Sequence, residues 1–393
     1  MTTHRSTLGI DPGKSAAAVV GVGATPYGSF PAATADSLAL DALTEAMTDS
    51  GLDPRDIDGL IVSRARSTEA IAAASGIEPR WVAQLPAEGR MTGPAIQVAA
   101  TAIATGSART VALVYGNDGR SKGHSYGGGG ATAAPAAEGY GTEPNLTTPY
   151  GMTSPGAFYA MMLERHMQLY GTTSEQLATI SQTFRSHAAH NPAAVFNKAI
   201  SLSDYLGARF IAEPMRIYDY CLINDGGTAL IMTSDDRARD CRQPPVHILG
   251  FGQQGRLRDS NFPPDDFWRS ALNQVGQDTY AMADCTRTDV DVLMAYDNFS
   301  PNVLFTLEGL GYCEAGESGY WIQDGRIALG GELPVNTSGG HLSESYMQGW
   351  ALNIEAVKQI RHQCGSRQVA DATLAQYVCA APVVSSVLYG ATR

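Results

Sequence analysis

The apolar run AVVGVG at residues 18 to 23 returns later in the chain as HILGFG at 247 to 252, with the same glycine ending. DIDGLI at 56 to 61 has a counterpart in DVDVLM at 289 to 294. The first pair is 229 residues apart (18 to 247) and the second 233 (56 to 289). Short apolar, β-branched runs are typical of buried strands. Two matched pairs at nearly one offset predict two halves of like topology.

Helices are predicted between these strands. Apolar side chains recur at helical spacing over residues 36 to 51, where Asp36 or Ser37 can cap the start and Gly51 can end the helix. The segment 93 to 106 is small and apolar on nearly every face, as a fully buried helix would be, and a buried strand follows at 109 to 116. Strands that alternate with helices indicate an α/β fold.

A segment outside the repeat interrupts the first half. Residues 117 to 156 hold four consecutive glycines and few periodic apolar positions, which predicts a long loop. Two helices follow, and we expect a capping box of Thr172 and Glu175 to open the second. His187 and His190 share a face of that helix, and no third ligand lies nearby in sequence, so a solvated face is favoured over a metal site.

These observations predict two structural units. The N-terminal unit spans residues 17–245 and includes a loop and helical insertion at 117–215, and the C-terminal unit spans 246–393. A strand predicted at 224 to 234 closes the first unit.

Composition excludes several classes of function. The 393 residues include 39 acidic and 27 basic side chains, a net charge of -12, and no run of lysine or arginine, which argues against nucleic acid and anionic membranes as partners. The six cysteines form no CxxC pair, so we expect neither a disulfide framework nor a metal site. Without an apolar signal-peptide stretch or a membrane-length run, a soluble, reduced, cytoplasmic protein is expected.

Two segments of the second half carry most of the chemical signal. They are MAYDNFSPNVLFTLEGLGYCEAG, from residue 294, and NTSGGHLSESYMQGW, from residue 336. In motif order the chain resembles the thiolase superfamily, in particular its sterol-carrier-protein-X branch. The resemblance covers roughly residues 17 to 393. It implies a thiolase fold, in which duplicated βαβαβ-type halves form a layered α-β-α-β-α arrangement.

The departures from this family are informative. Thiolases acylate a cysteine at the start of the buried helix of the first half, a place that falls here at Gly89 or Arg90, and no cysteine precedes Cys221. Such acyl transfer needs a thiolate as nucleophile. Claisen chemistry through an acyl-enzyme is therefore not expected.

Tyrosines stand at two catalytic positions of the family. Tyr346 matches the histidine of its G-H-P loop, at the start of a predicted amphipathic helix, and Tyr296 replaces the histidine or asparagine of the other motif. This pattern is similar to the lipid-transfer-protein-type aldolases of bacterial steroid side-chain degradation. The resemblance implies a lyase of lipid metabolism that cleaves a (tertiary) 3-hydroxyacyl-CoA to a ketone and a short acyl-CoA such as propionyl-CoA.

Retro-aldol cleavage needs a base for the β-hydroxyl, donors for the thioester enolate and an acid for the α carbon. We expect Tyr296 and Tyr346 to share proton removal and return, with helix-start backbone donors near Tyr346 holding the enolate oxygen. Which tyrosine is the base stays open. Supporting roles are expected for His341, Asn336, Gly339 and Gly340.

Cofactors and partners follow from the resemblance alone. It implies coenzyme A as part of the substrate, no covalently bound cofactor, and a homodimer core joined to a separate OB-fold and zinc-ribbon protein in a heterotetramer. Arg120 and Lys122 are the candidate contacts for the nucleotide end of coenzyme A. Cys379 is expected to be a buried core residue. Two alternatives stay open: a cysteine-independent acyltransferase or Claisen enzyme, and a non-catalytic acyl-CoA-binding scaffold.

Overall fold

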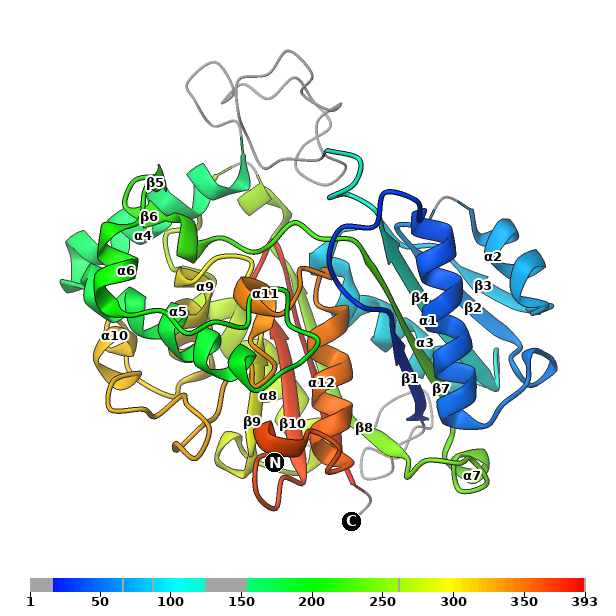
Figure 1. The fold of residues 1–393 in the computed structure, drawn as a ribbon. Helices are drawn as coiled ribbons and strands as arrows, with labels where there is room; N and C mark the ends of the chain where they lie inside the picture. The colour runs from blue at the N-terminus through cyan, green and yellow to red at the C-terminus, as the bar shows by residue number, and fades with distance from the viewer. Residues whose placement is uncertain (1–16, 66, 87, 124–153, 261, 392–393) are drawn as a thin grey trace.

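The computed structural model describes residues 17–65, 67–86, 88–123, 154–260 and 262–391 (Figure 1). The four-glycine stretch of the predicted long loop, Gly127 to Gly130, lies outside these residues.

Nine strands form one mixed sheet in the order β3-β2-β4-β7-β1-β8-β11-β10-β9. Their bounds in chain order are β1 Ala17–Ala24, β2 Gly59–Ser63, β3 Trp81–Ala83, β4 Thr110–Asn117, β7 Gly226–Ser234, β8 Val246–Gly255, β9 Val292–Ala295, β10 Leu374–Cys379 and β11 Val383–Gly390. The pairs β2/β4 and β10/β9 are parallel, and the pairs between them are antiparallel. The first-half order β2-β4-β7-β1 is therefore mirrored by β9-β10-β11-β8 in the second half, and β3 is an additional strand at the first-half edge.

The matched strands of the repeat meet at that centre. β1 pairs with β8 through Ala18 opposite His247 and Val19 opposite Val246, so the beginnings of the two repeated runs lie side by side. The division of the chain between residues 245 and 246 stays a prediction.

Helices cover the strands in layers. α1 (Ala35–Ser50) packs on one face of the first-half strands, and α8 (Arg269–Ala283) and α9 (Pro301–Leu310) lie in the core on the outer face of the second half. α3 (Thr92–Ala104) and α12 (Trp350–Ile360) share a third core with strand residues of both halves. The result is an α-β-α-β-α arrangement (Figure 1).

Alternation along the strands explains these layers. In β1, Ala18 and Val20 belong to the core under α1, whereas Val19 belongs to the core around α3 and α12. A strand that is buried on both faces needs apolar side chains at consecutive positions, as AAVVGV provides.

The helical insertion belongs in sequence to the first half but packs on the second. Its elements are α4 Pro155–Tyr170, α5 Ser174–Ala189, α6 Leu202–Gly207 and the hairpin of β5 Phe210–Ala212 and β6 Met215–Arg216. His166 of α4 places Nε2 3.0 Å from Oε1 of Glu308 in α9, and both side chains are buried. The remaining short helices are α2 Thr68–Ser75, α7 Asp235–Ala238, α10 Ser318–Trp321 and α11 Gly340–Ser343.

Helix starts differ in detail from the sequence expectation. α1 is capped by Thr34, whose side chain accepts from Ser37 N, so Asp36 is already helical. The capping box of α5 is Thr173 with Gln176. Thr172 is not the cap because its hydroxyl lies 2.8 Å from Nδ1 of His166. In α1 the cap is a local pair of Thr34 and Ser37, and in α5 a tertiary contact of Thr172 leaves the cap to Thr173.

Two further expectations were wrong. α12 begins at Trp350, so Tyr346 lies in the loop between α11 and α12 and not at a helix start. His187 is only 2% exposed, with Nδ1 3.2 Å from the carbonyl oxygen of Asn336 and Nε2 accepting from Leu329 N. A spacing pattern does not reveal that the loop around Asn336 covers that face of α5.

Among the helices of the described residues, none has the length and apolar character needed to cross a bilayer.

Candidate active site

Two tyrosine hydroxyls from the second half meet at the centre of the candidate site. Tyr296 directly follows β9, and its N–H donates to the carbonyl oxygen of Val378 in β10 at 2.8 Å. Tyr346 comes from the loop before α12, and its hydroxyl lies 3.0 Å from that of Tyr296. Tyr296 is 4% exposed and Tyr346 is half-buried. The structure thus brings together the two tyrosines that the sequence singled out.

A buried histidine packs against both rings. His341 meets the ring of Tyr296 edge-on at 4.7 Å between centroids and the ring of Tyr346 at 5.2 Å. Its Nε2 accepts from the N–H of Gly349 at 2.9 Å. Burial lowers the pKa of His341 to about 3, so the imidazole is neutral at physiological pH and its proton resides on Nδ1.

Asp297 holds the short helix α11, which carries this histidine. Its carboxylate accepts from His341 N at 2.9 Å and from Leu342 N at 3.2 Å, and its Oδ1 lies 3.3 Å from His341 Nδ1, although without hydrogen-bond alignment. Burial raises the pKa of Asp297 to about 7, against the lowering effect of these backbone donors. Sequence reasoning passed over Asp297, although it directly follows Tyr296.

The turn at 336–340 depends on unusual backbone angles. Asn336, Gly339 and Gly340 have φ angles of 49°, 104° and 61°, which glycine adopts readily. A Cβ on Gly340 would lie 2.3 Å from Oδ2 of Asp297. Asn336 donates from its side chain to Ala295 O at 2.8 Å. These backbone angles and contacts define the turn, and a supporting role of the three residues in the reaction stays a prediction.

The first half fixes the backbone of Tyr346. The N–H of Tyr346 donates to Oδ1 of Asn224 at 2.7 Å, and the carbonyl oxygen of Asn224 accepts from the side chain of Asn117 at 2.7 Å. Asn117 ends β4, and Asn224 precedes β7. Neither asparagine belongs to a recognisable motif, so only the tertiary structure identifies them.

Two of the backbone donors near Tyr346 are already in use. The N–H of Tyr346 is bound to Asn224 and that of Gly349 to His341. Each of these two groups would have to leave its partner to bind an enolate oxygen, and the role of backbone donors near Tyr346 stays a prediction.

A second polar cluster lies behind the same loop. Glu344 accepts from the hydroxyl of Ser338 at 2.6 Å and from the side chain of Asn191, after α5, at 3.0 Å. Burial, and to a lesser degree the neighbouring Glu355, raise the pKa of Glu344 to about 7. Glu355 itself pairs with Arg367 at 2.9 Å. The insertion is thereby tied to the loop of the candidate site.

Arg120 and Lys122 lie on an exposed turn after β4. Ser121, between them, donates from its backbone to Oδ1 of Asp225 at 3.1 Å. Asp225 is the direct neighbour of Asn224, which binds Tyr346. The turn is thus anchored one residue from a support of the site, and a role in binding coenzyme A stays a prediction.

The described part of the site offers no activated thiol. At the start of the first central helix stands Gly89, within the short 3₁₀ turn Gly89–Met91. Cys379 is fully buried at the end of β10, and burial raises the pKa of its thiol well above the ordinary range. A thiol held protonated in this way is a poor nucleophile.

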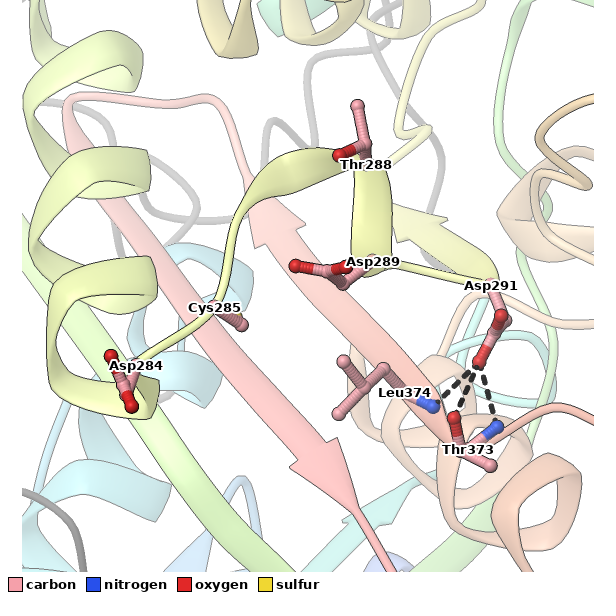
Figure 2. A pocket seen from close by; sticks show the side chains of 7 residues that line it. All are labelled: Asp284, Cys285, Thr288, Asp289, Asp291, Thr373 and Leu374. Atoms are coloured by element: carbon pink, nitrogen blue, oxygen red, sulfur yellow. Dashed lines mark hydrogen bonds between the residues drawn. The ribbon is translucent and has the colours of Figure 1, made fainter.

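An open pocket of about 660 Å³ lies at the opposite ends of β9 and β10 (Figure 2). Its lining residues are Asp284, Cys285, Thr288, Asp289, Asp291, Thr373 and Leu374. Asp291 accepts from the backbone of Thr373 and Leu374 at 2.7 and 2.9 Å. The residues that line this pocket lie at the starts of β9 and β10, whereas Tyr296 lies just after the end of β9. The pocket is therefore separate from the tyrosine pair. In the described residues no His, Cys, Asp and Glu cluster fit for a metal ion was found.

Comparisons with known proteins identify relatives of this chain. Residues 260–387 match the family model described as thiolase C-terminal domain-like. The chain is 37% identical over 354 residues to the 17-hydroxy-3-oxo-4-pregnene-20-carboxyl-CoA lyase of Mycobacterium tuberculosis, covering 88% of this chain and 91% of the relative. It is 36% identical over 356 residues to the steroid side-chain-cleaving aldolase of Thermomonospora curvata, covering 88% and 90%.

Two solved structures superpose on this chain. The Ltp2-ChsH2(DUF35) aldolase superposes with a TM-score of 0.87 at 33% identity, covering 98% of this chain and 100% of that chain. An acetyl-CoA acetyltransferase from Syntrophomonas wolfei superposes with a TM-score of 0.71 at 14% identity, covering 96% and 100%, which shows the shared thiolase fold alone.

Proposed function

The chain belongs to the thiolase-like family of steroid side-chain-cleaving aldolases, and we propose that it cleaves a tertiary 3-hydroxyacyl-CoA by a retro-aldol reaction at the Tyr296–Tyr346 pair. The observation that carries this proposal is the 3.0 Å contact between the two hydroxyls in a site without an activated thiol.

The tyrosine pair can complete a proton circuit. The deprotonated phenol accepts the proton of the substrate's β-hydroxyl, the bond between the α and β carbons breaks, and a ketone leaves. The second phenol then protonates the α carbon of the thioester enolate. A proton passes along the hydroxyl contact and restores the starting state. Phenols are ordinarily protonated at neutral pH, and a hydrogen bond from a neighbouring phenol favours the phenolate.

The neighbours of the pair suit this role. His341 is neutral because burial lowers its pKa to about 3, so it packs against both rings without adding a charge. Its position is held by Gly349 and by the contacts of Asp297 with α11. We propose that His341, Asn336, Gly339 and Gly340 position the tyrosines, since proton transfer needs reacting groups within hydrogen-bond reach.

The relatives suggest the substrate. The name of the mycobacterial lyase describes a steroid with a 17-hydroxyl and a coenzyme A thioester on a side chain at carbon 20. In such a molecule the hydroxyl is tertiary and sits on the β carbon. Cleavage between carbons 17 and 20 would give a 17-ketosteroid and propionyl-CoA. We propose this class of substrate here, with Arg120 and Lys122 near the nucleotide end.

We also propose a partner protein. The aldolase with a TM-score of 0.87 is an assembly of Ltp2 with the DUF35 protein ChsH2. By analogy, a DUF35 protein with an OB-fold and a zinc ribbon would join a homodimer of this chain in a heterotetramer. An acyl-CoA substrate fits the cytoplasmic setting that the sparse cysteines predict.

The thiolase route through an acyl-cysteine is disfavoured, because it requires a thiolate and burial raises the pKa of Cys379. A cysteine-independent acyltransferase is distinguished by its product. The scaffold alternative requires that the tyrosines be dispensable. One product analysis distinguishes the acyltransferase and the scaffold from the aldolase.

The test is product analysis by mass spectrometry. The chain, co-expressed with a DUF35 protein, is mixed with 17-hydroxy-3-oxo-4-pregnene-20-carboxyl-CoA. A 17-ketosteroid with propionyl-CoA is the expected result. A carbon-carbon bond formed from two acyl-CoA molecules would support the acyltransferase, and unchanged but bound substrate the scaffold.

A further inference from the structure

Because Gly89 has no side chain, there is space beside its Cα for the phenol of Tyr296. A Cβ built on Gly89 would lie 1.7 Å from the hydroxyl oxygen of Tyr296, 2.6 Å from Cζ and 3.0 Å from Cε2. Non-bonded carbon and oxygen atoms do not approach this closely. The hydroxyl therefore fills the volume that any side chain at position 89 would need.

Space alone requires glycine at this position. Gly89 is not among the residues with positive φ, so its backbone suits any L-amino acid. By contrast, Gly339 and Gly340 in the opposite loop have φ angles of 104° and 61° and require glycine for conformation.

Tyr296 has little freedom to move away. It is 4% exposed, its carbonyl oxygen accepts from the side chain of Asn302 at 3.0 Å, and its N–H is bound to Val378. Its ring packs edge-on against His341. A side chain at position 89 would force the phenol out of this setting and break its 3.0 Å contact with Tyr346.

We infer that Gly89 is a positioning residue of the reaction, which keeps open the space where the Tyr296 hydroxyl meets Tyr346. This inference rests on the proposed function for its catalytic consequence, but its steric part stands independently. It follows that the chain can have either the phenol pair or a side chain at position 89, but not both. This holds also for a nucleophilic side chain.

The first test compares Gly89→Ala with Gly207→Ala. A Cβ on Gly207, at the end of α6, would meet nothing within 4 Å, and its φ is not positive either, so it is a matched control. We expect Gly89→Ala to lower kcat about 100-fold or more, the scale of lost acid–base catalysis, with KM changed less than about threefold. Wild-type kcat in Gly89→Ala would overturn the inference.

The second test needs no substrate, so it separates this inference from the proposed function. Gly89→Ala is expected to lower Tm in the wild-type background but not together with Tyr296→Leu, which removes the clashing hydroxyl. Residues in contact are non-additive in this way. Folding of the double variant where Gly89→Ala alone fails to fold would give the same support. An equal loss of Tm in both backgrounds would refute the steric conflict, even if no cleavage is ever detected.

Discussion

The two central helices are α3 from the first half and α12 from the second. The segment before each helix contributes to the candidate site, but in a different way. Before α3 stands Gly89, whose missing side chain leaves space. Before α12 stand the short helix α11, which supplies His341, and the loop that supplies Tyr346. The two halves of the repeated fold thus contribute differently: the first provides space and backbone support, and the second provides the tyrosines that we propose to react.

The largest effect is expected from the reactive groups themselves. Tyr296→Phe and Tyr346→Phe should each lower kcat by roughly 10²–10⁴, because each removes a proton-carrying hydroxyl but keeps the ring. Steady-state kinetics measure the loss, and Tyr320→Phe, at a ring that is 61% exposed, is the control. Full turnover in either variant would remove that tyrosine from the scheme.

The next effect concerns the support of the pair within the second half. His341→Phe keeps an aromatic ring but leaves the buried N–H of Gly349 without its acceptor, which costs about 1–3 kcal/mol. We expect a fall in kcat of about tenfold or more together with a lower Tm. His190→Phe, at an exposed histidine, should change neither. An unaltered kcat in His341→Phe would show that the ring edge alone suffices.

The contribution of the first half is tested at Asn224. Asn224→Ala removes the acceptor of the Tyr346 N–H and should destabilise the fold by about 1–3 kcal/mol and lower kcat about tenfold. Denaturant unfolding and kinetics measure the two effects. Asn273→Ala, on the exposed face of α8, is the comparison. If both variants behaved alike, the second half would position Tyr346 by itself.

A smaller effect should appear in the pH dependence of stability. The pKa of Glu344 is raised by burial to about 7 from an ordinary value of 4.5, so the folded chain keeps a proton that the unfolded chain loses. The stabilising contribution of the neutral acid is complete below pH 4.5 and is lost as pH rises toward and through 7. Glu344→Gln stays neutral, so its Tm relative to wild type should rise over this window. Each pKa unit corresponds to about 1.4 kcal/mol. A pH-independent difference would contradict the shift.

The smallest effect is expected at the pocket of Figure 2. Asp284 has a φ of 52°, a conformation that asparagine also tolerates. Asp284→Asn should therefore leave kcat and KM within about twofold of wild type. A larger change would mean that this pocket communicates with the tyrosine pair.

The sequence predicted much of this arrangement because its signals were local. Apolar alternation marked the strands, a repeated run marked the duplication, and motif order pointed to Tyr296 and Tyr346. The helix caps at Thr34 and Thr173 were missed because neighbouring polar residues compete for the same role. Sequence patterns place helix ends only to within one or two residues.

The supporting residues were beyond sequence reasoning for a different reason. Asn224 is 122 positions from Tyr346, and nothing in the residues around it indicates a hydrogen bond to that backbone. His187 was expected in solvent because helical spacing shows which side chains share a face but not what covers that face.

By itself the sequence determined the α/β duplication, the tyrosines at the two motif positions and the absence of a cysteine before Cys221, since each follows from residue type and order. The tertiary structure alone decided that Gly89 lies against the phenol of Tyr296, that His341 is neutral, and that Asn224 holds Tyr346. Burial and distance produce these properties, and both arise only when segments far apart in the chain pack together.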